Sequence, residues 1–141
     1  MKPLLIESTD NCPKVVLNEE SQIFLIEGES RPTNTFNFYQ PIVKWLEGYG
    51  KLLFWQKEHF GKNRRMTFQF KLTYFHSTSA KFISDILHLL DQFYMDGYDV
   101  RVKWYYHKED LEMKESGEEY MKMLVKLPIK MIAYEDPEVE D

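Results

Sequence analysis

The pattern of hydrophobic and polar residues changes its period in the middle of the chain, between residues 66 and 95. Residues 66–74 alternate between apolar and polar side chains, which is the period of a strand buried on one face. The following apolar residues recur at helical spacing: Phe82, Ile83, Ile86, Leu87, Leu90 and Phe93. Between the two patterns lie His76-Ser77-Thr78-Ser79, and short hydroxyl side chains favour a helix N-cap. The pattern therefore predicts an interior strand, a cap over residues 76–79 and an amphipathic helix.

The N-terminal third alternates short apolar runs with turn residues. Leu4–Glu7, Lys14–Leu17 and Ile23–Glu27 are predicted strands, and residues 10–13 form a turn between the first two. Because the second and third strands are close in sequence, we expect them to pair as an antiparallel hairpin. Residues 28–32 end the third strand.

A first helix is predicted from Asn34 to about Tyr49, and Pro41 lies inside its apolar pattern. Proline lacks an amide donor and crowds the preceding turn. Either the helix starts near Gln40, with Pro41 in its first turn, or Pro41 kinks it, and we favour the kink.

Glycines suggest where the predicted helices end. Gly48 and Gly50 are expected to end the first helix, and Asp96-Gly97 the second. Residues 51–60 either extend the first helix or pack as an irregular segment. Residues 61–65 are expected to form a basic surface turn.

The C-terminal third predicts a strand, a charged helix and a last strand. Residues 100–106 alternate like the central strand, and residues 129–134 form the last strand. Residues 108–124 are expected to be helical, with an interruption at Ser116-Gly117. Residues 135–141 form an acidic tail that we expect to be frayed.

The order of these elements predicts the fold class. A strand–helix–strand sequence implies parallel pairing through a right-handed crossover. The alternation in the two central strands is unlike that of strands covered on both faces. We therefore expect an α/β (α+β-like) fold over residues 1–134, a single domain with a small mixed sheet and helices mainly on one face.

Composition narrows the classes of protein to consider. The chain has 141 residues, 43% hydrophobic and 16% aromatic, which suits one domain with a single core. Its formal charge of −5 argues against a nucleic-acid or anionic-membrane partner, and no run is long enough to insert into a membrane. The single cysteine, Cys12, cannot form an internal disulfide, so we expect a cytoplasmic location.

No motif indicates catalysis, a metal site or a cofactor. The histidines are scattered and show no metal-ligand spacing: His59, His76, His88 and His107. Neither a GxxxxGK[ST] nor a GxGxxG phosphate-binding loop is present. The carboxylate pairs Glu109-Asp110 and Glu118-Glu119 fit the solvated face of a helix. We therefore expect a non-enzymatic protein without a cofactor.

The aromatic residues offer an alternative function. Trp45, Trp55 and Trp104–Tyr106 could line a ligand pocket, although such residues more often form the core of a small domain. Tyr105 should point away from its two neighbours, toward the less covered face of the sheet. The alternative to a signalling role is thus a small-ligand binding domain that uses this aromatic-rich face.

Three segments resemble the SiaC-like regulatory phosphoproteins. YFHSTSAK (residues 74–81) is similar to the family's Y-F-N-T-S-S-x-K motif, and residues 28–34 resemble its G-x-S-x-P-E-N turn. The stretch from Trp104 to Glu119 resembles its W-Y-Y … E-D … G-E-E stretch. The three segments occur in the family's order and spacing.

The resemblance implies a STAS-like fold, of the anti-sigma-factor-antagonist type, and a bacterial partner-switching protein. It implies a dedicated protein kinase and a PP2C-type phosphatase as partners. In characterised relatives, the unphosphorylated form binds and activates an effector, a diguanylate cyclase, and promotes aggregation or biofilm formation. The phosphoacceptor falls on Ser77, with Thr78 and Ser79 as alternates, and Tyr74, His76 and Lys81 surround it.

Phosphorylation at this point is physically reasonable. A phosphoryl group adds about −1.5 to −2 charge and three strong acceptors. A helix N-terminus stabilises such a charge, and Lys81, one turn further on, could pair with it. We therefore expect a partner that packs over this corner to be displaced while the domain stays folded.

Overall fold

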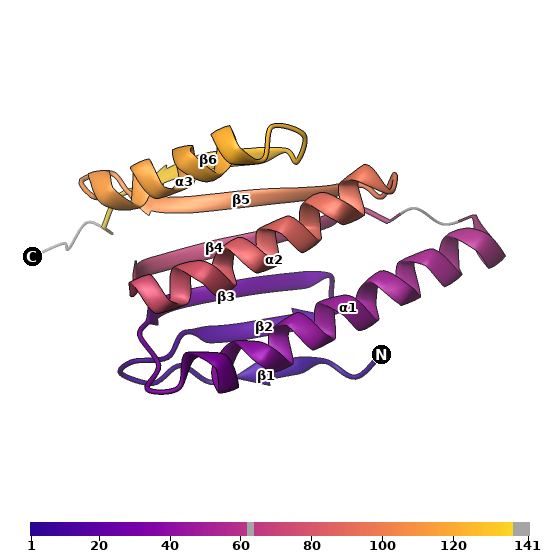
Figure 1. Ribbon diagram of the computed structural model, residues 1–141, viewed down its shortest axis with the longest axis horizontal. Helices are drawn as coiled ribbons and strands as arrows, with labels where there is room; N and C mark the ends of the chain where they lie inside the picture. Colours follow the sequence, from indigo (N-terminus) through magenta and orange to yellow (C-terminus); the bar gives the residue numbers. More distant parts are fainter. Residues whose placement is uncertain (62–63, 137–141) are drawn as a thin grey trace, which may run out of the picture.

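The computed structural model describes residues 1–61 and 64–136, and in this part of the chain one six-stranded sheet carries three helices on one face (Figure 1). The strands are β1 (Leu4–Ile6), β2 (Lys14–Asn18), β3 (Ile23–Ser30), β4 (Met66–Phe75), β5 (Val100–His107) and β6 (Ile129–Tyr134). The helices are α1 (Thr35–Phe60), α2 (Ser77–Met95) and α3 (Leu111–Met123). The predicted mixed fold with helices on one face is confirmed.

The strands lie in the sheet in sequence order. Pairs β1–β2 and β2–β3 are antiparallel, whereas β3–β4, β4–β5 and β5–β6 are parallel. Each parallel connection contains one helix, and crossovers of a single hand along one direction place all three helices on the same face. Strand β4 lies between β3 and β5, as predicted. Among the described residues, no helix covers the other face of the sheet (Figure 1).

The core lies between the sheet and the helices. The inward residues of β4 are Met66, Phe68, Phe70 and Leu72, each at most 1% exposed. Helix α2 covers them with its buried stripe of Ile83, Ile86, Leu87, Leu90 and Phe93. The change of period in the sequence thus marks the strand and helix at the centre of the fold.

Helix α1 starts where the sequence pattern begins. Asn34 is its N-cap, and the Asn34 side chain accepts a hydrogen bond from the Asn37 amide at 3.0 Å. A start near Gln40 is therefore wrong. The helix continues through Pro41, and a kink at that residue stays a prediction.

Helix α1 also runs further than Gly48 and Gly50, so the predicted helix end was wrong and residues 51–60 extend the helix. Gly50 serves packing instead, because a Cβ there would lie 2.6 Å from the Phe93 ring of α2. The helix ends at Gly61, which adopts the left-handed conformation at φ 63°.

Helix α3 is continuous, so the interruption predicted at Ser116-Gly117 was also wrong. A Cβ on Gly117 would lie 2.5 Å from Trp104 and 2.7 Å from Met131. The glycine therefore lets α3 approach β5 and β6 closely. The sequence alone does not reveal this close packing, so the glycine was interpreted as a helix break.

Parts of two predicted segments lie outside the described residues. These are residues 62–63 of the basic turn and residues 137–141 of the acidic tail. The end of the domain at residue 134 therefore stays a prediction. Within the described residues, none of the helices is long and apolar enough to cross a membrane. The same residues contain no group of three or more His, Cys, Asp or Glu side chains able to hold a metal ion.

Candidate functional site

The hydroxyl cluster lies at the carboxyl end of β4, where the chain turns into α2. The N-cap is His76, which is extended at φ −74° and ψ 157° and makes no side-chain capping bond. The N-cap therefore lies within the predicted residues 76–79, but Ser77, Thr78 and Ser79 are the first three residues of the helix, so a hydroxyl as the capping group was wrong. The turn is fixed by the backbone instead, because the His76 amide donates to the Ser30 carbonyl at 2.9 Å.

Ser79 faces the interior. Its hydroxyl accepts from Ser30 Oγ at 3.0 Å and donates to the Ser30 carbonyl at 3.2 Å. Since Ser30 Oγ donates to Ser79, the Tyr39 hydroxyl that contacts Ser30 Oγ acts as donor. Both serines are fully buried. These three hydroxyls, hereafter the buried triad, tie β3, α1 and α2 together with every hydroxyl satisfied.

Tyr39 keeps this corner neutral. Burial raises the pKa of the Tyr39 hydroxyl, and the hydrogen bonds with Ser30 and Ser79 offset part of that rise. The Tyr39 ring stacks on Phe82 of α2, with centroids 5.5 Å apart and planes 7° from parallel. On its inner side, the junction is thus buried and fixed by hydrogen bonds and ring stacking.

Thr78 and Ser77 face outward. Thr35 Oγ1, on the first residue of α1, donates to Thr78 Oγ1 at 3.1 Å, and His76 Nδ1 lies 3.3 Å from the same oxygen. Ser77 is exposed, and its hydroxyl makes no hydrogen bond within the described part of the chain. Two helix N-termini therefore meet beside Ser77, and their dipoles favour negative charge there.

Tyr74 departs from the sequence pattern, which placed it with the buried residues of β4. It is 45% exposed, because the β3–β4 register shifts at Gly28/Glu29. Such an irregularity changes which face the following side chains occupy. Phe75 packs against Trp104 instead, at 6.2 Å between ring centroids. Tyr74 is thus displayed beside the start of α2.

Phe36 is a further exposed aromatic side chain at this corner, and the sequence analysis missed it. It lies in the first turn of α1, is 56% exposed and meets the Phe82 ring edge-on at 6.3 Å. Phe36 lies at helical spacing from the buried Tyr39, a pattern that is typical of a core position. Lys81 is exposed as well, and its Nζ lies 5.6 Å from the Phe82 ring centroid.

The large aromatic residues do not gather on the open sheet face. Trp45 and Trp104 are buried in the core at 8% and 1% exposure, and Trp55 is on α1. Tyr105 does point to the open face, where the Lys71 Nζ lies 4.7 Å from its ring centroid. Tyr134 of β6 lines the same hollow of about 530 Å³ as Tyr105, so these two tyrosines remain of the predicted aromatic-rich ligand face.

The third segment, from Trp104 to Glu119, meets the second where Trp104 packs against Phe75, and the helix α3 that it begins reaches the first turn of α2. The Tyr120 hydroxyl of α3 donates to the Ala80 carbonyl at 3.3 Å, and burial raises the pKa of Tyr120 to about 12. Trp104 Nε1 donates to the Met113 carbonyl at 3.0 Å and fixes α3 on β5. All three sequence segments thus converge on one structural corner.

The structure is thus a one-sided α/β domain with the exposed Ser77 hydroxyl at the start of α2. A model of the SiaC family of regulatory phosphoproteins matches residues 6–134. Since the match covers nearly the whole chain, the protein belongs to the SiaC family.

Comparisons with individual proteins agree with the family match. An uncharacterized protein of Pseudomonas aeruginosa strain UCBPP-PA14 is 25% identical over 120 residues, which is 85% of this chain and 88% of that protein. Apo-SiaC from P. aeruginosa superposes with a TM-score of 0.79 at 22% identity, covering 94% of this chain and 100% of that chain. The complex of the diguanylate cyclase SiaD with its activator SiaC contains a chain that matches with a TM-score of 0.80 at 22% identity, covering 93% and 99%. These structures share the fold.

Proposed function

We propose that the protein is a non-enzymatic cytoplasmic signalling switch that is phosphorylated reversibly on Ser77. A partner kinase adds the phosphoryl group and a PP2C-type phosphatase removes it. The unphosphorylated form binds and regulates an effector, a diguanylate cyclase in biofilm or aggregation control. The observation that carries the proposal is the exposed Ser77 hydroxyl at the start of α2, in a family of regulatory phosphoproteins. That SiaC activates a diguanylate cyclase in P. aeruginosa supports this class of effector.

The surroundings of the three hydroxyls favour Ser77 as acceptor. Ser79 is fully buried in the triad, so a kinase could reach it only after local unfolding. Thr78 is exposed, but its oxygen is already bonded to Thr35 and lies near His76. Ser77 Oγ makes no such contact in the described part of the chain, so it can enter a kinase active site without breaking a bond.

Phosphorylation of Ser77 would change the surface rather than the fold. The start of α2, with the start of α1 beside it, stabilises the added charge. Lys81, exposed one turn further on, can move from the Phe82 ring to pair with the phosphate. An effector that packs over the corner would then have to desolvate a dianion, which opposes binding.

Exposed aromatic residues beside Ser77 suit the effector contact. Phe36 and Tyr74 are 56% and 45% exposed on two sides of the junction. Aromatic side chains that are buried on association supply much of the binding energy at interfaces. We therefore place the centre of the effector surface at Phe36, Tyr74 and the unphosphorylated Ser77.

Binding of the purified cyclase to both forms of the protein tests the proposal. Phosphorylation should weaken binding by about 100-fold or more, and Phe36→Ala should weaken it by about 10-fold or more. Phe54→Ala is the matched control, since Phe54 is 60% exposed on the same helix but far from Ser77. Equal binding of the phosphorylated and unphosphorylated forms would sink the proposed mechanism.

A further inference from the structure

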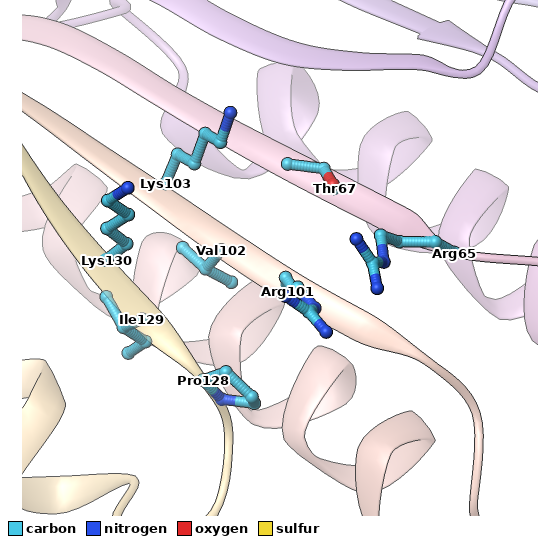
Figure 2. Close-up of a pocket in the computed structure, with 8 residues that line it drawn as sticks. All are labelled: Arg65, Thr67, Arg101, Val102, Lys103, Pro128, Ile129 and Lys130. Carbon is cyan, nitrogen blue, oxygen red and sulfur yellow. The ribbon is translucent and has the colours of Figure 1, made fainter.

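The open face of the sheet carries a group of cations at the amino ends of β4, β5 and β6. Arg65, Arg101, Lys103 and Lys130, hereafter the basic strip, line a shallow hollow of about 350 Å³ (Figure 2). Thr67 contributes a hydroxyl to the same hollow. The basic strip lies on the sheet face opposite to the helices, and at the opposite end of β4 from Ser77.

The two lysines of the basic strip are direct cross-strand partners. Lys103 of β5 pairs in register with Lys130 of β6, and neither forms an ion pair within the described residues. Strands β5 and β6 are parallel and about 4.8 Å apart, so two ammonium groups in register on the same face repel each other. On the β4 side, the partner of Lys103 is the uncharged Gln69. The lysine pair therefore carries an electrostatic cost that nothing in its immediate register relieves.

The arginines of the basic strip share one carboxylate. Arg65 Nε lies 3.1 Å from Asp99 Oδ2, and Arg101 Nε lies 3.4 Å from Asp99 Oδ1. Within the described residues, Asp99 is thus the one carboxylate in an ion pair with these four cations. In a chain with a formal charge of −5, so local an excess of positive charge points to an anionic partner.

The shape of the site selects the kind of anion. The backbone amides of β4 and β5 are engaged on both sides in the sheet, and β6 is an edge strand, so among the described residues the two inner strands offer no cradle of amides to a single phosphate. Arg65 lies just before β4, Arg101 and Lys103 lie on β5, and Lys130 lies on β6. Since neighbouring strands are about 4.8 Å apart, the cations form a row across the sheet rather than a ring around one anion. Such spacing fits several carboxylates presented side by side along a peptide.

We propose that the basic strip is a docking surface for an acidic segment of a protein partner. The surface is distinct from the Ser77 corner, and the inference goes beyond the proposed switch without depending on it. Charge complementarity supplies orientation and rate of association as well as affinity, so this second contact would align a partner on the domain.

The test measures binding of a fluorescein-labelled deca-glutamate peptide to the full chain at low salt, by fluorescence anisotropy. The double variant Lys103→Gln/Lys130→Gln should weaken binding by about 5- to 30-fold. The matched control is Lys44→Gln/Lys122→Gln, which removes the same charge from exposed positions on the helices and should change binding by less than about twofold. Equal losses in the two double variants, or no binding by the wild type, would overturn the proposal.

Two further measurements test whether the basic strip prefers carboxylates to phosphate and whether its lysine pair is destabilising. Inorganic pyrophosphate should not displace the peptide at lower concentration than unlabelled deca-glutamate does; if it did, the basic strip would be a phosphate site and the proposal would be wrong. Because the like-charge pair is removed, the Tm of Lys103→Gln/Lys130→Gln should rise by about 1–4 °C. A fall in Tm would show that the lysines stabilise the fold and would contradict the proposal's electrostatic basis.

Discussion

The inner and outer sides of the first turn of α2 contain the same kind of residue in opposite environments. Ser79 is fully buried in the triad with Ser30 and Tyr39, whereas Ser77, two residues earlier, is exposed. Two residues correspond to a rotation of about 200° around a helix. One helical turn therefore contains the buried, hydrogen-bonded hydroxyl of Ser79 and the exposed hydroxyl of Ser77. The inner contacts of Ser79 hold the turn, and with it Ser77, in place.

The largest expected effect comes from placing the same charge on each side of the turn. Ser79→Asp should lower the free energy of unfolding by about 3–5 kcal/mol, because it puts an unpaired carboxylate among buried groups. Ser77→Asp should change it by less than about 1 kcal/mol, since a helix N-terminus favours an anion. Urea unfolding of the two variants checks the contrast. Comparable losses of unfolding free energy in the two variants would contradict the difference in burial between Ser79 and Ser77.

Removing each hydroxyl should also lower the free energy of unfolding more on the inner side than on the outer side, but the difference should be smaller. Ser79→Ala should cost about 1–3 kcal/mol, because it takes the hydrogen-bond partner from the buried Ser30 hydroxyl. Ser77→Ala should stay within about 0.5 kcal/mol of the wild type, since this exposed position lacks such a bond in the described structure. Thermal unfolding followed by circular dichroism measures both. A wild-type Tm for Ser79→Ala would contradict the structural role of the triad.

Alkaline pH should destabilise the inner side of the turn through the Tyr39 hydroxyl. Burial raises the folded-state pKa of Tyr39, so the protonated form stabilises the fold below the ordinary tyrosine pKa, and this contribution is lost as pH rises through the raised value. Tyr39→Phe should reduce the loss of stability above pH 10, by at most about 1.4 kcal/mol per pH unit. Tyr74→Phe, at a position 45% exposed, is the control that removes a tyrosine hydroxyl without touching the buried triad. Unfolding titrations between pH 9 and 11 compare the slopes.

The smallest expected effect concerns the contact between the two helix starts. Thr78→Val keeps the branched shape but loses the hydroxyl that accepts from Thr35. Because this bond is exposed, the loss of stability should be about 0.5 kcal/mol or less. Phosphorylation of Ser77 should persist in this variant, as phosphopeptide mapping would show. Complete loss of phosphorylation would move the acceptor to Thr78.

Much of the fold could be predicted from periodicity. The alternation of β4 and the helical spacing of α2 located the central unit, because both elements bury one face and expose the other. The same alternation in β5 predicted the open face of the sheet. Glycine was misleading where it serves packing: Gly50 and Gly117 lie inside helices against Phe93 and Trp104.

The details of the site depended on contacts between distant segments. The sequence indicated a hydroxyl-rich junction, but only the Ser30 and Tyr39 contacts distinguish Ser79 from Ser77. A register shift between β3 and β4 exposes Tyr74, and the position of α1 exposes Phe36. Neither feature has a local sequence signal, since both arise from how neighbouring elements pack.

Mapping the phosphate tests the central claim most directly. Wild type, Ser77→Ala and Thr78→Ala would be incubated with the cognate kinase and ATP, and the modified residue identified by mass spectrometry. Our account predicts one phosphoryl group on Ser77 in the wild type and in Thr78→Ala, none in Ser77→Ala, and an unchanged circular dichroism spectrum after modification. Full modification of Ser77→Ala, or a phosphate found on Ser79, would contradict it.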